Sequence, residues 1–216
     1  MNERERFTRI MQFQTVDKVP NYELGLLKRT AERWYSEGLP RGVDWKEYFE
    51  IGDPRHIADV PNMDMIPSFE EKVIEETDRY IISINKGGIK SKNLKSSDTF
   101  MPQWLEYPVK NRQDFRKLKQ RYDAETPGRY PAPELWERKV KAWRKRNYQL
   151  RPPNMHGTYW TLRQWMGTKN LSLAFYDQPL LIHEMIDLLS DFVIKVLQKA
   201  VKEVDFDYFY IPEDMA

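Results

Sequence analysis

DQPLLIHEMIDLLSDFVIKVLQKAVKEVDFDYFYI, residues 177–211, is the stretch that decides the fold class expected from this sequence. Its first residues, Asp177–Pro179, form a favourable helix start, and apolar residues then recur at helical spacing. The spacing predicts an amphipathic helix over Gln178–Val204 with one face in a core. The short apolar run Tyr208–Ile211 follows and predicts a buried strand.

The segment before this helix predicts a second strand. Tyr148–Met155 has the pattern of a strand that leads into His156-Gly157, and Thr161–Met166 begins a helix. Strand, helices and strand in this order predict a βαβ unit, whose crossover implies parallel strands with helical cover. Ligand sites of such units lie at the carboxyl ends of the strands. Here these ends are His156–Tyr159 and Pro212–Asp214.

The upstream half predicts a β-hairpin within about residues 70–95. Tyr80–Ile84 and the residues from Ile89 onward flank Asn85–Gly88, a Gly-Gly turn. A hairpin is foreign to a parallel barrel, so we expect an excursion from the main fold. A buried strand is expected at Val19–Leu27, and helices at Asn2–Gln14, Thr30–Glu37, Asp44–Ile51, Asn111–Tyr122 and Glu134–Asn147.

The composition excludes several classes of function. Lys+Arg 35 against Asp+Glu 33 leaves a net charge of +2, which gives no drive toward nucleic acid or a membrane surface. The absence of cysteine excludes disulfides, thiolate zinc sites and cysteine nucleophiles. No stretch approaches the ~18 apolar residues of a membrane span, and the charged first residues lack a signal-peptide pattern. A cytoplasmic protein that binds neither nucleic acid nor membrane is expected.

Glu213 and Asp214 end the last expected strand and are the best candidates for chemistry. Adjacent carboxylates there can bind a cation, accept a proton or hold an N–H donor. A solvated loop, or a cap for a following helix, is the alternative. His156 stands directly before Gly157, where a backbone can approach a ligand closely. Its alternative is a hydrogen-bonded structural histidine.

Three further polar residues have both a functional and an ordinary interpretation. His183 and Asp187 stand four residues apart on the long expected helix, a spacing that can chelate a metal. Because no third ligand is in view, an exposed helix face is favoured and no metal site is expected. Arg163 could bind a substrate carboxylate, or it could form an ion pair with Glu213 or Asp214.

The densest basic run, from Arg138 to Arg151, lies among aromatic residues that include Trp136, Trp143 and Tyr148. Basic and aromatic residues together can bind RNA. On a helix the aromatic residues can instead face the core while the charged residues face water, and the near-neutral total favours this arrangement. Trp165 likewise could belong to a core or line a cleft.

A series of short stretches along the chain carries a family resemblance. They are Arg4–Phe7 with Val19-Pro20, Pro67–Glu76, Met101–Val109, Leu162–Gly167, Phe175–Pro179 and Glu213–Ala216. Their order and spacing resemble the uroporphyrinogen decarboxylase superfamily, in particular its branch near the corrinoid-dependent methyltransferases.

The resemblance implies a (β/α)₈ barrel, an α/β fold with its active site in the cleft at the carboxyl ends of the strands. Such a barrel needs about 250 residues, so these 216 residues are expected to form its N-terminal half. That half would be an incomplete TIM barrel with the hairpin as an excursion. The family's active-site aspartate matches Asp64, and its active-site tyrosine falls near Trp165. The expected catalytic residues are therefore Asp64, Glu213 and Asp214, and the expected substrate-binding residues are His156, Tyr159, Arg163 and Trp165.

The activity implied by the resemblance is methyl transfer that involves a thiol or a corrinoid. Uroporphyrinogen decarboxylation is the alternative, although Glu23–Arg29 stands where family decarboxylases carry an Arg-Gln-Ala-Gly-Arg loop. A third hypothesis is an inactive remnant that only binds a ligand. No cofactor is expected in this chain, whereas the family implies zinc or a corrinoid in a complete parent protein. The expected partners are a small-molecule substrate or a corrinoid protein.

A half-barrel would leave the edge of the strand Tyr208–Ile211 unpaired and an apolar face uncovered. Unpaired edges and bare apolar patches promote association. The chain is therefore expected to be marginally stable on its own and to aggregate or form a homodimer.

Overall fold

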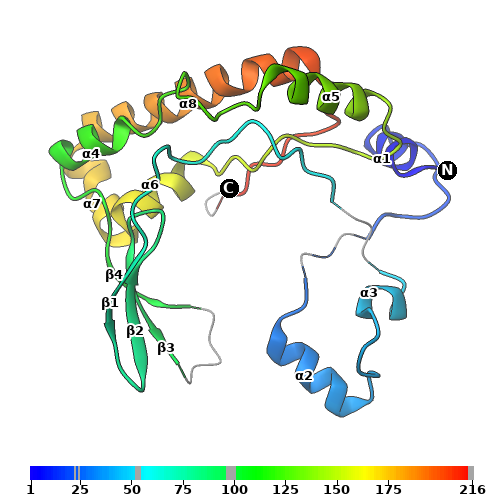
Figure 1. Ribbon diagram of the computed structural model, residues 1–216, viewed down its shortest axis with the longest axis horizontal. Helices are drawn as coiled ribbons and strands as arrows, with labels where there is room; N and C mark the ends of the chain where they lie inside the picture. Colours follow the sequence, from blue (N-terminus) through cyan, green and yellow to red (C-terminus); the bar gives the residue numbers. More distant parts are fainter. Residues whose placement is uncertain (22, 24, 52–54, 96–100, 214–216) are drawn as a thin grey trace.

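The computed structural model describes residues 1–21, 23, 25–51, 55–95 and 101–213. It contains the elements α1 (Glu3–Met11), α2 (Lys28–Glu37), α3 (Trp45–Tyr48), β1 (Lys72–Glu76), β2 (Tyr80–Ile84), β3 (Lys90–Leu94), β4 (Gln103–Glu106), α4 (Arg112–Lys119), α5 (Pro133–Arg144), α6 (Thr158–Met166), α7 (Thr168–Asp177) and α8 (Pro179–Glu203). Figure 1 shows an arch in which α5 and α8 form the top. The sheet and the α2–α3 segment extend from the same side of it, at opposite ends.

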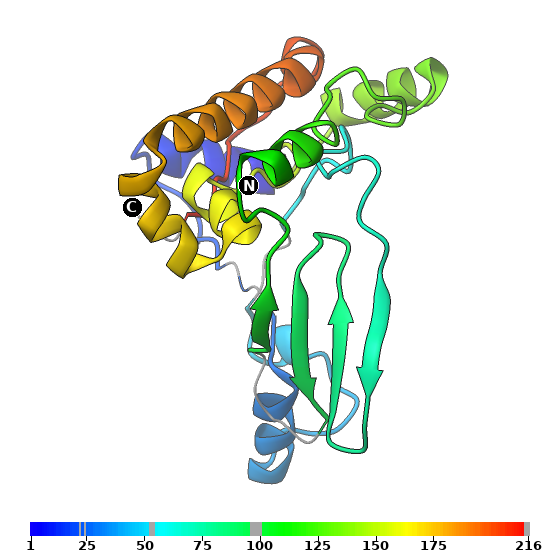
Figure 2. The ribbon, with the colours of Figure 1, turned by 90° about the vertical axis from the view of Figure 1, so that its left-hand side faces the viewer.

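The strands form one open sheet in the order β1-β2-β3-β4, and every neighbouring pair is antiparallel. The register pairs Tyr80 with Leu94 and Ile84 with Lys90, so the expected hairpin is present. It is part of a larger sheet than expected, because β1 and β4 extend it on both sides. Figure 2 shows the sheet extending away from the helices α4–α8 and joined to them through its upper end.

The turn between β2 and β3 depends on its asparagine and its second glycine. The side-chain oxygen of Asn85 accepts hydrogen bonds from the backbone N–H of Gly87 and of Ile89, both at 3.0 Å. Gly88 has a φ of 80°, and a Cβ at this position would lie 2.9 Å from ring carbons of Phe69. Glycine is therefore required for both backbone conformation and space, and the turn packs against the loop that carries Phe69.

The prediction that the chain forms half of a parallel (β/α)₈ barrel is wrong. The sheet that the described residues form is antiparallel, and neither Tyr148–Met155 nor Tyr208–Ile211 forms a strand. These segments lie alongside each other through Asp207 N–H to Leu150 O and Gly157 N–H to Pro212 O, both 2.9 Å. Ile57 and Arg151 add one isolated parallel bridge. The βαβ unit is replaced by extended segments beneath α8.

Proline and side-chain bonding explain why these segments do not form a ladder. Pro152, Pro153 and Pro212 have no N–H to donate to a neighbouring strand. The N–H of Leu150 donates at 2.8 Å to the carboxylate of Asp207 instead of to a backbone carbonyl. Apolar runs indicate burial, but regular backbone pairing is what makes a strand.

The long helix expected over Gln178–Val204 is confirmed as α8. Its apolar face contributes to two cores: Met185 belongs to one with α4, α6 and α7, and Ala200 belongs to one with α5 and the extended segments. The helix α7 was not expected from the sequence. Within the described ranges, no helix has the length and apolar content needed to cross a membrane.

The basic run on and after α5 is largely built into the fold. Trp136 and Trp143 are buried in the core beside α8, so the core-facing interpretation of these aromatics is confirmed. Arg146 is buried and bonds Asp207 at 2.8 Å, and Arg4 of α1 bonds the same carboxylate at 2.7 Å. Burial alone would raise the pKa of Asp207, but these hydrogen bonds outweigh it and lower the pKa.

The buried strand expected at Val19–Leu27 is not found among the residues described there. Val19 and Leu27 are exposed, and α2 begins directly after Leu27 without burying any of its residues. The α2–α3 segment is instead held by its own aromatic side chains. The ring of Trp34 lies 6.4 Å from that of Trp45 and 5.2 Å from that of Phe49, centroid to centroid.

Candidate functional site

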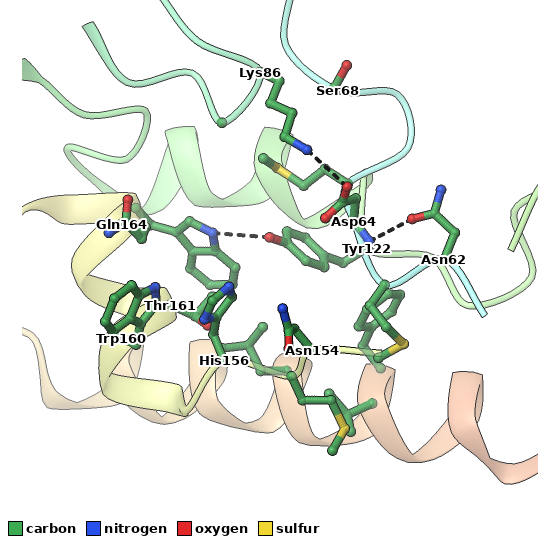
Figure 3. Close-up of a pocket in the computed structure, with 18 of the residues that line it drawn as sticks. Asn62, Asp64, Ser68, Lys86, Tyr122, Asn154, His156, Trp160, Thr161 and Gln164 are labelled. Carbon is green, nitrogen blue, oxygen red and sulfur yellow. Dashed lines mark hydrogen bonds and ion pairs between the residues drawn. The ribbon is translucent and has the colours of Figure 1, made fainter. Parts of the chain in front are cut away.

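A cavity of about 670 Å³ lies between the loop 62–68, the turn 85–87, α6 and α8. Tyr122 and the residues 154–156, which lead into α6, complete its lining. Figure 3 shows Asn154 and His156 on one side of the cavity, facing the ring of Tyr122 across it. The cavity therefore lies where the end of one extended segment meets the sheet and two helices.

Two buried aromatic side chains, Trp165 and Phe192, and the partly buried Tyr122 form a connected wall. The indole N–H of Trp165 donates to the hydroxyl oxygen of Tyr122 at 3.3 Å. The ring of Tyr122 lies 5.3 Å from that of Trp165 and 5.2 Å from that of Phe192 on α8. Burial raises the pKa of Tyr122 to about 12, so this hydroxyl stays protonated at neutral pH and can still donate its own hydrogen.

His156 is the titratable imidazole of the cavity. Its ring stacks on Trp160 at 5.2 Å between centroids, with 9° between the ring planes. Although His156 keeps contact with solvent, partial burial lowers its pKa, and the nearby carboxylates of Asp64 and Glu213 oppose that effect without cancelling it. The neutral form, which can accept a proton or a hydrogen bond, is therefore favoured at neutral pH.

An exposed ion pair stands at the rim. The ammonium group of Lys86, in the β2–β3 turn, lies 3.2 Å from the carboxylate of Asp64. The backbone N–H of Asp64 donates to the side-chain oxygen of Asn62 at 2.8 Å, which shapes the loop. Both charged side chains are largely exposed, so the pair marks the cavity mouth and contributes little to stability.

Arg129 positions the loop that carries Asp64. It is 3% exposed, and its guanidinium carbon lies 4.6 Å from the centre of the Phe192 ring. Instead of a carboxylate, it bonds backbone carbonyls, those of Asn62, Asp64, Arg121 and Asp123. One buried cation thus joins the 62–64 loop to the residues on either side of Tyr122.

Glu213 caps the start of α6. Its carboxylate accepts hydrogen bonds from the backbone N–H of Tyr159 at 3.0 Å and of Trp160 at 2.8 Å. These are first-turn donors without partners in the helix, and a negative charge there is favourable. Gly157 makes room for it, because a Cβ there would lie 2.0 Å from a carboxylate oxygen of Glu213.

The structure places three of the seven expected site residues on the lining of the cavity. Asp64, His156 and Trp165 line the cavity. Arg163 lies next to it, with its guanidinium carbon 4.9 Å from the centre of the Trp160 ring. Tyr159 packs against the core. Glu213 caps the first turn of α6, a helix that precedes it in the sequence, and not a following helix as the alternative interpretation expected. Asp214 lies outside the described residues.

Sequence reasoning missed four residues that shape this site. Asn154 and Lys86 line the cavity, Tyr122 forms its wall, and Arg129 holds its loop. Asn154 could have been predicted in the same way as His156, because both residues stand at the end of the extended segment. Nothing in the local sequence distinguishes Arg129 from other arginines, because its acceptors come from distant segments.

The described residues do not supply a metal site. No three His, Cys, Asp or Glu side chains among them are grouped closely enough to hold an ion. His183 and Asp187 lie on an exposed face of α8, as the ordinary interpretation of their spacing expects. The zinc site that the family resemblance implies therefore has no ligand set in this part of the chain.

Comparisons with family models, with curated proteins and with solved structures give no match to this chain.

Proposed function

We propose that this chain binds a small organic molecule in the cavity between α6, α8 and the β2–β3 turn. The observation that carries the proposal is the cavity itself, whose volume of about 670 Å³ is in the range of drug-sized ligand sites. Aromatic and aliphatic side chains supply the larger part of its surface, together with polar side chains such as Asn154, His156 and Gln164. This combination is typical of small-molecule sites.

Filling the cavity tests the binding. Val193 lines the cavity on α8, whereas Val201, on the same helix, is exposed. A library of small organic molecules is screened by saturation-transfer NMR against the wild type, Val193→Trp and Val201→Trp. We expect ligands that bind the wild type and Val201→Trp but not Val193→Trp. Ligands that bind all three proteins equally, or no ligand at all, would contradict the proposal.

We propose methyl transfer as the reaction to test in this cavity, with the sequence resemblance as its support. His156 suits one step, because a neutral imidazole nitrogen can accept the proton of a bound thiol. The thiolate would then take the methyl group, and the methyl donor would keep the electron pair of the bond that breaks. A corrinoid methyl donor would be presented by a partner protein. No step is assigned to zinc, since the described residues do not fit it. A cytoplasmic location belongs to the same proposal.

Uroporphyrinogen decarboxylation is less well supported. A substrate with several carboxylates needs several cations, and Lys86 is the only lysine or arginine among the described residues that line the cavity. Its charge is already paired with Asp64.

A measurement of turnover distinguishes the hypothesis of an active enzyme from that of an inactive remnant. The rate of methyl transfer from methylcob(III)alamin to a simple thiol is followed by absorbance. We expect His156→Gln to lower it by about 100-fold, the usual effect of losing a general base. Ligand binding without turnover in the wild type would favour the remnant that only binds.

A further inference from the structure

The hydrogen-bonding groups that line this cavity include four neutral carboxamides, those of Asn62, Asn85, Asn154 and Gln164. The side-chain oxygen of Asn62 accepts a hydrogen bond from the backbone N–H of Asp64. The side-chain oxygen of Asn85 accepts hydrogen bonds from backbone N–H groups of the β2–β3 turn. Asn154 and Gln164 also line the cavity, and within the described part of the chain no hydrogen bond engages their side chains. Two carboxamides, each with a donor and an acceptor, are thus available to a ligand.

Asn154 is the better placed of the two. Figure 3 shows its side chain beside that of His156, with both pointing toward the ring of Tyr122, to which the indole N–H of Trp165 donates. A planar molecule that lies against these rings would present its edge to Asn154 and His156. A carboxamide pairs in two-point fashion with another amide, a lactam or a heterocycle edge, because each side offers one donor and one acceptor.

Among the described residues around the cavity, the charged side chains are already engaged within the protein. Lys86 and Asp64 neutralise each other at the rim. The carboxylate of Glu213 is directed at the first turn of α6, and the guanidinium of Arg129 at backbone carbonyls. A charged ligand would lose water without gaining a partner of opposite charge, which is unfavourable.

We infer that the ligand is an uncharged planar amide, lactam or nitrogen heterocycle, held edge-on by Asn154 and His156 against the aromatic wall of Tyr122 and Trp165. This inference rests on the proposed binding of a small molecule in the same cavity. It adds the chemical class of that molecule and assigns Asn154 as the residue that selects it.

Three probes of one shape test the class. Benzamide is neutral, benzoate is its anionic counterpart and benzamidine its cationic one. Each is titrated into the full chain, and the NMR signal of the Trp165 indole N–H, identified with Trp165→Phe, reports on the cavity. We expect benzamide to bind at least about tenfold more tightly than the other two, the effect of one well-made hydrogen-bonded pair against an uncompensated charge.

Variants at Asn154 identify the residue responsible. Asn154→Leu keeps the approximate size and should remove the preference for benzamide. Asn154→Asp keeps the shape, adds a negative charge and should shift the preference to benzamidine. Asn147→Leu, at an exposed position that does not line the cavity, is the matched control and should bind benzamide as the wild type does.

Each other outcome has a definite meaning. Equal binding of all three probes, or tighter binding of benzoate, would overturn the ligand class and leave the proposed binding function standing. An unchanged preference in both Asn154 variants would overturn the role of Asn154. If none of the probes moves the Trp165 signal, and the library screen also finds no ligand that binds the wild type but not Val193→Trp, the proposed function itself fails.

Discussion

The imidazole of His156 is subject to opposing effects, of which burial is the larger. Burial lowers its pKa, whereas the carboxylates of Asp64 and Glu213 raise it. The unfolded chain therefore takes up this proton more readily than the folded one. The contribution to stability is present above the unfolded pKa of about 6.5 and is lost as pH falls through the lower folded value.

We expect a ¹H NMR titration to place the pKa of His156 below about 6.5. Asp64→Asn removes one carboxylate that raises this pKa, so the variant should titrate at still lower pH. In urea unfolding from about pH 7 to about pH 5, His156→Gln should lose less stability than the wild type. A higher pKa in Asp64→Asn would mean that the rim carboxylate does not act on the imidazole.

Arg129 concentrates several long-range bonds in one side chain. Arg129→Met keeps the apolar stem but removes the donor of four backbone carbonyls, in hydrogen bonds that are partly buried. We expect it to lower the free energy of unfolding by about 2–4 kcal/mol. The same substitution at Arg112, whose exposed ion pair with Glu184 spans 2.8 Å, should cost less than about 1 kcal/mol. Urea unfolding of both variants measures the difference, and equal effects would contradict the assigned role.

At the level of elements, the start of α6 depends on one contact between Gly157 and Glu213. Gly157→Ala places a Cβ where the carboxylate lies, and Glu213→Ala removes the cap itself. Each should lower the free energy of unfolding by about 1–2 kcal/mol. Because both remove the same interaction, the double variant should lose clearly less than the sum. A double-mutant cycle by urea unfolding measures this, and simple additivity would show that Gly157 is not needed to admit the cap.

Sequence reasoning succeeded where structure is local. The apolar spacing of α8 and the Gly-Gly turn of the hairpin involve residues within a few turns of one another, so each pattern determines its own element. It failed for Tyr148–Met155 and Tyr208–Ile211, because whether an apolar run pairs in a ladder depends on its distant neighbour. Here prolines and the side chain of Asp207 take the place of backbone partners.

Sequence reasoning likewise identified some residues of the candidate site and missed others. His156 and Trp165 were singled out from their place after an apolar segment or in a family-like stretch, and both line the cavity. Lys86 comes from the hairpin, which the expected fold treated as an excursion. Tyr122 follows α4, far along the chain from the other walls. A cavity built from five separate segments cannot be predicted from any one of them.

The whole molecule exposes more surface than a compact chain of its size. Its accessible surface is 14507 Å², whereas a monomer of 26.1 kDa exposes about 10,600 Å². The excess far exceeds the roughly 800 Å² that each partner buries in a standard interface. Part of the exposed surface comes from three consecutive apolar residues, because Phe209, Tyr210 and Ile211 are all exposed. Burial against a second copy of the chain would cover such a surface.

We therefore expect sedimentation velocity to show concentration-dependent association into dimers or larger species. Phe209→Ser combined with Ile211→Ser removes two half-exposed apolar side chains from the exposed segment, and should weaken association by about tenfold or more. Phe13→Ser is the matched control, because Phe13 is 100% exposed beyond the end of α1 and is separate from that segment in the sequence. A wild-type monomer at every concentration would contradict this expectation. An equal effect of Phe13→Ser would show that general hydrophobicity, rather than the segment Phe209–Ile211, drives the association.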